Sequence, residues 1–416
     1  MVEASSTLLV FLAGLTLVLV AAHALGIAAD RLGFAPVVGE LLTGLLLGPT
    51  LLGVVAPGVT ALVVPVPDAL TALASLGLIL LLVLAGTEVD VVALRRSIRR
   101  TLALATGAFV VPFLAGFALG WWLPARYLVA PDQRFAFALF LATALSVSAV
   151  PVAVRVLIDL DALDRPVGQL TLTAAIVVDA VGWIALTVVS DVARAGEANP
   201  VAVGQTLVVL TAFVVLVVVL GRRPVARLFD VVDSVRSPVS TGLAVVLVVG
   251  FALAATSLAL GLEAVLGAFL AGVLVRNHLD PETSQVFEMV VLGFFAPVFF
   301  ATAGLRADLS GLFALDTLLV GGATLTVAVL GKFVGAALGA WVTGLSRAET
   351  LCLAIGLNAR GAMEIVVAAI GLALGILTPT VYTVVVLVAI VTSVMTPPLL
   401  RKALSRLPAE SSSAPT

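Results

Sequence analysis

The sequence predicts an all-α protein that crosses the lipid bilayer many times. Hydrophobic residues make up 62% of its 416 residues and charged residues only 11%, and the mean hydropathy is +1.25. A soluble domain cannot bury that much apolar surface, so the bilayer is the expected solvent. Apolar runs long enough to span a bilayer recur along the whole chain and are separated by short polar joints.

Thirteen apolar segments are predicted to be membrane spans, and the polar joints between them are too short to hold a soluble domain. The segments are 5–28, 36–53, 69–87, 101–123, 134–158, 166–190, 201–220, 239–259, 262–275, 286–304, 315–343, 348–376 and 379–400. We therefore expect residues 1–404 to form one transmembrane unit. Residues 405–416 are expected to be a short disordered cytoplasmic tail.

The basic residues predict the orientation, because cytoplasmic joints carry an excess of Lys and Arg. An odd number of spans puts the two termini on opposite sides. If the C-terminus is cytoplasmic, sixteen of the 22 basic residues lie in inward joints. Four lie in outward joints and two lie within spans: Arg126, Arg134, Arg194 and Arg306, then Lys332 and Arg360. We expect a multi-pass protein of the plasma (inner) membrane with its N-terminus outside.

Motifs for soluble chemistry are missing from the sequence. No cluster of metal-ligand residues, nucleotide-binding glycine loop or catalytic triad is found, and only two histidines exist. The single Cys352 rules out an intramolecular disulfide. We expect no enzymatic activity, no cofactor and no nucleic-acid partner.

Asp179 interrupts the otherwise apolar or small-residue stretch "TAAIVVDAVGWIAL", residues 173–186, which contains no basic residue. An ionised side chain at the centre of a span costs at least about 2.5–3.5 kcal/mol, so it indicates function. A buried carboxylate is neutralised by a proton or by a bound cation, and the two ligands compete for it. The alternative is that Asp179 is a static partner of Lys332 or of a hydroxyl. The other ionisable residues inside predicted spans are Glu40, Glu88, Lys332, Arg360 and Glu364.

Two of these charged positions allow both a functional and a structural interpretation. Lysine can lose its proton when buried, so Lys332 suits a proton-carrying or charge-switching role. Alternatively, it pairs permanently with a carboxylate and holds two helices together. Arg360 and Glu364 are four residues apart, which favours a buried ion pair over direct ion binding. Asn358 and Gly361 beside them predict a broken helix.

A second broken helix is predicted within "ATALSVSAVPVAVRVL", residues 142–157. Pro151 removes a helical hydrogen bond, and Thr143, Ser146 and Ser148 supply hydroxyls at membrane depth. Carbonyl and hydroxyl oxygens are suitable ligands for an alkali cation at Asp179. The alternative is a proline-kinked helix whose hydroxyls bond to their own backbone. Elsewhere, Gly44-xxx-Gly48 predicts close helix packing.

Taken together, these segments resemble the second cation/proton antiporter family, the Na+/H+ and K+/H+ (Kef-type) exchangers. The resemblance covers nearly all of residues 10 to 400, and it rests on the order and spacing of several motifs. These are "PVVGELLTGLLLGP", "LGLILLLVLAGTEVD", "ATALSVSAVPVAVRVL", "AAIVVDAVGW", "FFAPVFFATAGLRADL", "GKFVGAALGAW" and "LNARGAMEIVVAAIG".

The resemblance implies an NhaA-like antiporter fold for residues 1–404, a sodium/hydrogen exchanger transmembrane domain. That fold has thirteen helices in inverted repeats, with two crossing, unwound helices in a core domain. A separate bundle usually forms the interface of a homodimer. Family members exchange Na+, K+ or Li+ for protons by moving the core against the bundle.

The resemblance also assigns residues. Asp179 matches the essential carboxylate that binds cation and proton in turn, and Lys332 matches the core lysine. Arg360 and Glu364 match the charged pair near the second unwound helix. The three hydroxyl residues Thr143, Ser146 and Ser148 fall on the first.

Two departures from the family pattern refine the expectation. Many members carry an acid before the essential one, which pairs with the lysine and is linked to electrogenic exchange; here that residue is Val178. We therefore expect electroneutral exchange, with Glu364 or Asp179 as the partner of Lys332. The nucleotide-binding regulatory domain of many Kef-type channels is also missing, which favours a plain exchanger.

Two other transport functions remain as alternatives: a Kef-type potassium efflux channel and an organic-anion symporter on the same fold. A membrane sensor is disfavoured, because the sequence leaves no room for an output domain. One carboxylate and several hydroxyls accept both Na+ and K+, so the sequence does not predict which is preferred.

Overall fold

Long apolar helices make up most of the computed structural model, which describes residues 2–48, 51–60, 68–88, 98–148, 150–163, 165–195, 200–233, 238–307 and 314–407. Within these residues, eight helices are long and apolar enough to cross a membrane. They are α1 (Val2–Arg31), α5 (Asp68–Thr87), α7 (Ile98–Trp122), α10 (Pro166–Ala195), α13 (Pro238–Ala259), the continuous run α15 (Pro281–Val290), η4 (Val291–Phe295) and α16 (Ala296–Leu305), α17 (Leu315–Val342), and α20 (Pro379–Leu404). The all-α membrane class is confirmed.

The remaining predicted spans correspond to shorter or bent helices. The pair α11 (Pro200–Leu220) and α12 (Arg222–Asp233) bends by 41° and gives a ninth span if it is counted as one. Four segments form shorter helices: α2 (Pro36–Leu47), α8 (Arg134–Ser146) with α9 (Val150–Asp159), α14 (Ala264–Val275), and α18 (Arg347–Leu357) with α19 (Ala362–Ala373). The count of thirteen spans therefore stays a prediction. Short joints contain α3 (Leu52–Val55), α4 (Pro57–Thr60), η1 (Ala125–Tyr127), η2 (Pro131–Gln133) and η3 (Arg276–His278).

Some residues used for the sequence predictions lie outside the described part of the chain. They are Arg95, Arg96 and Arg236 of the inward joints and residues 408–416 of the predicted tail. The side chains of Arg155 and Pro151 are also outside the description.

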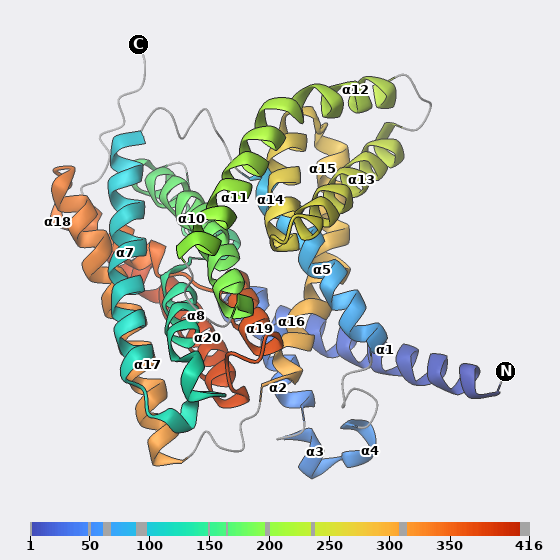
Figure 1. Cartoon of the computed structure of the whole chain (residues 1–416), viewed down its shortest axis with the longest axis horizontal. Helices are drawn as coiled ribbons and strands as arrows, with labels where there is room; N and C mark the ends of the chain where they lie inside the picture. The colour runs from blue at the N-terminus through green and yellow to red at the C-terminus, as the bar shows by residue number, and fades with distance from the viewer. Residues whose placement is uncertain are drawn as a thin grey trace.

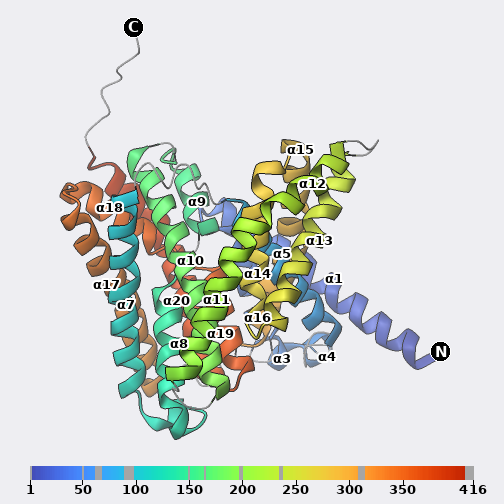
Figure 2. The ribbon, with the colours of Figure 1, turned by 45° about the horizontal axis from the view of Figure 1, so that its top comes forward.

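The helices form two groups that lie side by side (Figure 1). The core group consists of α7, α8, α9, α10, α17, α18, α19 and α20, which contact one another. The bundle group consists of α1, α2, α5, α13, α14, α15 and α16. Helix α11 contacts both α10 and α14, and Figure 2 shows the same division with α11 between the groups.

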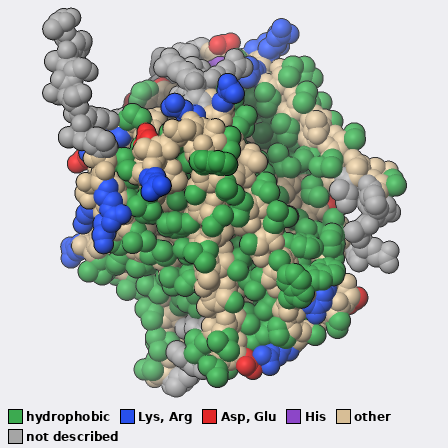
Figure 3. Space-filling model, turned by 90° about the vertical axis from the view of Figure 1, so that its left-hand side faces the viewer, with side chains coloured by type: hydrophobic (Ala, Val, Ile, Leu, Met, Phe, Trp, Pro, Cys, Tyr) green, Lys and Arg blue, Asp and Glu red, His purple; other side chains and the backbone are tan. Residues whose placement is uncertain are grey.

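The outer surface of the core group is apolar, as expected for a face in contact with lipid. Hydrophobic side chains cover most of the middle of the face in Figure 3, and Lys and Arg side chains gather toward its upper part and lower edge. On α7 and α17, Leu114 is 61% exposed and Trp341 78% exposed. Apolar side chains at this level of exposure are stable when hydrocarbon replaces water around them.

Glycines allow the helices of each group to cross closely. A methyl group added at Gly335 of α17 would lie 2.1 Å from the carbonyl oxygen of Gly107 on α7. One added at Gly44 of α2 would lie 2.0 Å from the carbonyl oxygen of Ala301 on α16, which confirms the close packing predicted there. At these crossings only glycine lets the two backbones touch.

The glycine crossings of the bundle group occur in matching pairs. Gly39 of α2 packs on the Leu25 carbonyl of α1, and Gly267 of α14 packs on the Leu253 carbonyl of α13. In the same way, Gly44 of α2 meets Gly304 of α16, while Gly272 of α14 meets Gly86 of α5. The α1–α2 pair of the first half thus has a counterpart with the same glycine spacing in the α13–α14 pair of the second half, and the α2–α16 crossing has one in the α14–α5 crossing.

Two helices of the core group are interrupted near their middle. Helix α8 ends at Ser146 and α9 begins at Val150, while α18 ends at Leu357 and α19 begins at Ala362. The predicted role of Pro151 needs correction, because it lies in the first turn of α9. A proline there removes no helical hydrogen bond, since the first N–H groups of a helix have no partner in it. The interruption therefore precedes the proline.

Candidate functional site

Helix α10 places Asp179 between the two interrupted helices. One turn further along, Gly182 allows close approach, because a methyl group there would lie 2.6 Å from Val147 Cγ1 and 2.8 Å from Met363 Cε. Val147 follows the end of α8, and Met363 lies in the first turn of α19. Asp179 itself is buried, with 6% of its surface exposed. The carboxylate therefore lies inside the core group at the level of both interruptions.

The Asp179 carboxylate is only partly satisfied by the protein. The backbone N–H groups of Ser148 and Val150 lie within its reach. Its Oδ1 atom is buried and has no hydrogen-bond partner among the described residues. Buried polar atoms are nearly always paired, so an unpaired carboxylate oxygen indicates a place for a proton, a water or a cation.

Lys332 of α17 is fully buried and is bound by oxygen atoms of the first interruption. Its Nζ donates to the carbonyl oxygen of Ser146 and, at 2.8 Å, to Ser148 Oγ. Within the described residues it forms no ion pair with a carboxylate inside 4.0 Å. The expected pairing with Glu364 or Asp179 is therefore not present in this conformation.

Arg360 lies in the second interruption and reaches across to the first. Its guanidinium donates to the carbonyl oxygens of Ala144 at 3.2 Å and Leu145 at 2.6 Å, both on α8. It also donates to the carbonyl oxygen of Ala328 on α17 at 3.1 Å. The pair with Glu364, at 3.2 Å, is almost completely buried, which confirms the predicted ion pair. Arg360 thus joins three helices.

These contacts account for every carbonyl left free at the end of α8. The last four carbonyls of a helix have no partner within it, and their negative dipole end attracts cations. The donors are the backbone N–H of Val147 for Thr143, Arg360 for Ala144 and Leu145, and Lys332 for Ser146. The two buried cations are therefore explained as the cap of one interrupted helix.

The three predicted hydroxyl residues have different roles. Thr143 and Ser146 donate to the carbonyls of Leu139 and Ala142 in their own helix, at 2.8 and 2.6 Å. This is the ordinary arrangement that the sequence left open as an alternative. Ser148 instead donates to the carbonyl of Leu357 at 2.9 Å while accepting from Lys332. It therefore connects the two interruptions.

Several buried polar atoms around the interruptions have no partner in the described part of the chain. Besides Asp179 Oδ1, they are Asn358 Oδ1, Arg360 Nε and Glu364 Oε2. Carbonyl and carboxylate oxygens among them are the type of ligand that an alkali cation takes. The site therefore offers oxygen ligands that the protein itself does not use.

Ser393 of α20 is a site residue that the sequence analysis did not select. Its hydroxyl donates to the carbonyl oxygen of Arg360, whose peptide lies in the second interruption. The signal in the sequence was a hydroxyl residue within the apolar segment 379–400, which is the same kind of signal that selected Ser146 and Ser148. Hydroxyls in spans more often bond to their own helix, so this signal is weak.

Comparison with protein families gives one match that covers most of the chain. The model of the family "Sodium/hydrogen exchanger, transmembrane" matches residues 4–402.

Individual relatives agree with this match. The chain is 29% identical to the Na+/H+ antiporter NhaS4 of Synechocystis, over 96% of this chain and 98% of that protein. It is 28% identical to the Na+/H+-K+ antiporter GerN of Bacillus cereus, over 93% and 94% of the two chains. The K+/H+ antiporter 1 of Saccharomyces cerevisiae is 29% identical over 95% of this chain, but only 46% of that protein is covered.

The fold is similar to that of a solved structure, the sodium proton antiporter MjNhaP1 from Methanocaldococcus jannaschii at pH 8. The TM-score is 0.68, and the alignment covers 95% of this chain and 97% of that one. The sequence identity is 19%, so this similarity concerns the fold alone.

Proposed function

Because this chain belongs to the sodium/hydrogen exchanger family, we propose that it exchanges a monovalent cation, Na+ or K+, for protons by alternating access. The observation that carries the proposal is Asp179, a buried carboxylate with an unused oxygen between two interrupted helices. The relatives' names, which include Na+/H+ and K+/H+ antiporters, support both cations equally.

Asp179 couples the two fluxes by binding one ligand at a time. A proton neutralises the carboxylate, and so does a cation that has lost its water shell. Either neutral form crosses the low-dielectric interior at tolerable cost, whereas the empty, ionised site does not. The hydroxyls of Thr143, Ser146 and Ser148 donate their hydrogens to backbone carbonyls, and their oxygens keep the lone pairs that complete the coordination of the cation.

Lys332, Arg360 and Glu364 hold the site in shape without carrying ions. Lys332 and Arg360 cap α8, and their bonds to carbonyl oxygens do not require a titrating partner. With Val178 in place of a second acid, Asp179 is the single carboxylate that exchanges its ligand. One cation is then exchanged for one proton, and transport is electroneutral.

The core group moves against the bundle group during exchange. We propose thirteen spans in two inverted repeats, with the interrupted helices α8–α9 and α18–α19 crossing at Asp179. The matching glycine crossings of α1–α2 with α13–α14, and of α2–α16 with α14–α5, support such a repeat. The bundle group then provides the fixed frame and the interface of a homodimer.

We place the protein in the plasma membrane with its N-terminus outside and its C-terminus in the cytoplasm. The support is the distribution of basic residues between the two sets of joints. In this orientation, the ends of α7 and α16 and the start of α17 face outward.

Exchange is tested in proteoliposomes with an imposed pH gradient, reported by a pH-sensitive dye. Na+, K+ or Li+ is added in turn to vesicles that contain wild type, Asp179→Asn or Asp191→Asn. Asp191 lies on the same helix and accepts a hydrogen bond from Thr206 at 2.5 Å, so its variant is a matched control.

We expect at least one cation to dissipate the gradient in wild type and in Asp191→Asn, and none to do so in Asp179→Asn. Full activity of Asp179→Asn, or no response of wild type to any of the three cations, would refute the proposal. Dissipation at channel-like rates that requires no proton in return would indicate an efflux pore instead.

A further inference from the structure

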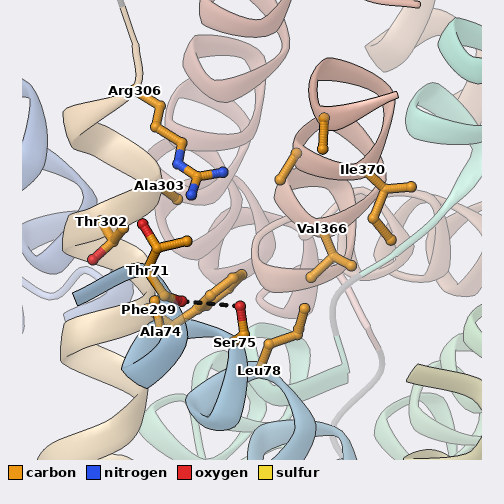
Figure 4. A pocket seen from close by; sticks show the side chains of 12 residues that line it. Thr71, Ala74, Ser75, Leu78, Phe299, Thr302, Ala303, Arg306, Val366 and Ile370 are labelled. Carbon is orange, nitrogen blue, oxygen red and sulfur yellow. Dashed lines mark hydrogen bonds between the residues drawn. The ribbon is translucent and has the colours of Figure 1, made fainter. Parts of the chain in front are cut away.

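A cavity of about 160 Å³ lies on the boundary between the bundle group and the core group. Helices α5 and α16 form its bundle side, and α19 forms its core side (Figure 4). Val366 and Ile370 of α19 face Thr71, Ser75 and Arg306 across it. Since the two groups are proposed to move against each other, the cavity lies on the moving boundary.

The two walls differ in polarity. The α19 wall is apolar, with Val366, Ala369, Ile370 and Ala373. The opposite wall carries the hydroxyls of Thr71 and Ser75 and the guanidinium of Arg306, which extends toward the cavity above Thr71 in Figure 4. Ser75 already donates to the Thr71 carbonyl at 2.9 Å, so its hydrogen is used.

Among the described residues that line the cavity, Arg306 is the one with a charged side chain. Within the described residues it has no carboxylate inside 4.0 Å, unlike Arg126 and Arg194, which pair with Asp316 at 3.0 Å and Glu263 at 2.6 Å. No carboxylate among the described residues therefore neutralises the positive charge of Arg306 at close range. A cleft with low-dielectric walls and charge of one sign concentrates ions of the opposite sign and depletes ions of the same sign.

The cavity begins close to the candidate site. Val366, on its core wall, follows Glu364 by two residues on α19, and Glu364 pairs with Arg360 in the second interruption. Arg306 lies at the other extreme, directly after the last residue of α16. An entry path that runs along this boundary from the α16 end, through the cavity and toward Asp179 would pass the guanidinium.

We propose that Arg306 is an affinity-setting residue for exchange, because its charge lowers the cation concentration in the cavity. It thereby raises the apparent KM for a cation that arrives from the α16 end, which is the outer end in the proposed orientation. The inference rests on the proposed cation/proton exchange. A cation arriving from the opposite end does not pass Arg306, so the effect is confined to one side.

The experiment measures the apparent KM for cation-driven proton movement in right-side-out and inside-out membrane vesicles. The variants are Arg306→Gln, which removes the charge, and Arg306→Lys, which keeps it. Arg126→Gln is the matched control, because Arg126 pairs with Asp316 at the start of α17 and does not line the cavity. Each variant is measured at low and at high ionic strength set with N-methylglucamine.

For Arg306→Gln we expect an apparent KM about two- to fivefold lower than wild type for externally added cation, the size expected for one partly hydrated charge. Arg306→Lys and Arg126→Gln should leave the apparent KM for external cation unchanged. When the cation is added on the cytoplasmic side, all three variants should have the apparent KM of wild type. The difference should shrink at high ionic strength.

An apparent KM for external cation that is unchanged in Arg306→Gln would overturn the inference. An equal decrease of this KM in Arg306→Lys would also overturn it, and so would an equal decrease in Arg306→Gln for cation added on either side of the membrane. These results leave the proposed function intact if wild type exchanges and Asp179→Asn does not. Conversely, failure of wild type to exchange any cation refutes the proposed function itself.

Discussion

Buried charges in this protein are balanced by different kinds of partner. Glu364 has a guanidinium within 3.2 Å, whereas Lys332 is held by a backbone carbonyl and a hydroxyl. Asp179 has neither arrangement in full, and one of its oxygens is unpaired among the described residues. Glu364 also has an unpaired oxygen, but its charge is balanced by Arg360, whereas no basic side chain among the described residues lies within 4.0 Å of the Asp179 carboxylate. A carboxylate without such a partner is the one suited to take a proton or a cation.

Replacing Lys332 tests this distinction. Lys332→Met leaves the carbonyl of Ser146 and the hydroxyl of Ser148 without their donor, which should lower the free energy of unfolding by about 1–3 kcal/mol. Exchange should slow but remain independent of membrane voltage, because Lys332 carries no transported charge. The measurement is the initial exchange rate in proteoliposomes at zero voltage and under a thiocyanate diffusion potential.

The control for this experiment is Lys402→Met, which alters the second of the two lysines, an exposed residue near the end of α20. It should match wild type in stability and rate. If wild-type exchange depends on voltage and that dependence vanishes in Lys332→Met, then Lys332 carries charge through the cycle and the electroneutral account is wrong.

The positions of the charged residues could be predicted from the sequence, but their partners could not. An ionisable side chain in an apolar span is recognisable by its cost, which selected Asp179, Lys332 and Arg360. The carbonyls that bind Lys332 and Arg360 belong to Ala144, Leu145 and Ser146, where any residue would offer the same oxygen. Backbone acceptors carry no sequence signal, so only the structure identifies the helix cap.

At the level of elements, hydrophobic length predicted where helices lie but not where they break. The segments 134–158 and 348–376 each read as one span, yet each contains two helices. Gly361 and Asn358 indicated the second break correctly. For the first, Pro151 indicated the right region but the wrong cause, because it lies in the first turn of α9 rather than interrupting a helix.

Close glycine crossings set the distance between helices, and α17 allows a matched test. Gly335→Ala places a methyl group 2.1 Å from the Gly107 carbonyl, so α7 and α17 must separate. We expect a loss of about 1–3 kcal/mol, as for other overpacked positions. Gly322→Ala, on the same helix, places its methyl group in open space and should leave stability unchanged or slightly raised.

Thermal unfolding in detergent, followed by size-exclusion chromatography after heating, compares the two variants. Equal melting temperatures for Gly335→Ala and Gly322→Ala would contradict the assigned packing of α7 against α17.

For the whole molecule, the division into two helix groups fits the proposed movement, because Asp179, the interruptions and the capping cations all belong to the core group. In that proposal the site moves as a unit and the carboxylate faces the two sides in turn. The sequence motifs predicted the family and the all-α class, both of which are confirmed. They could not predict the cavity at Arg306, because its walls come from α5, α16 and α19, which are far apart in the chain.

Competition between a proton and a cation for Asp179 is the central claim, and proton release tests it most directly. Purified protein in weakly buffered detergent solution receives Na+, K+ or choline while a pH indicator records released protons. We predict release of up to about one proton per chain on adding Na+ or K+, none with choline, and none from Asp179→Asn. Equal release from Asp179→Asn, or none from wild type with either cation across the pH range, would contradict the account.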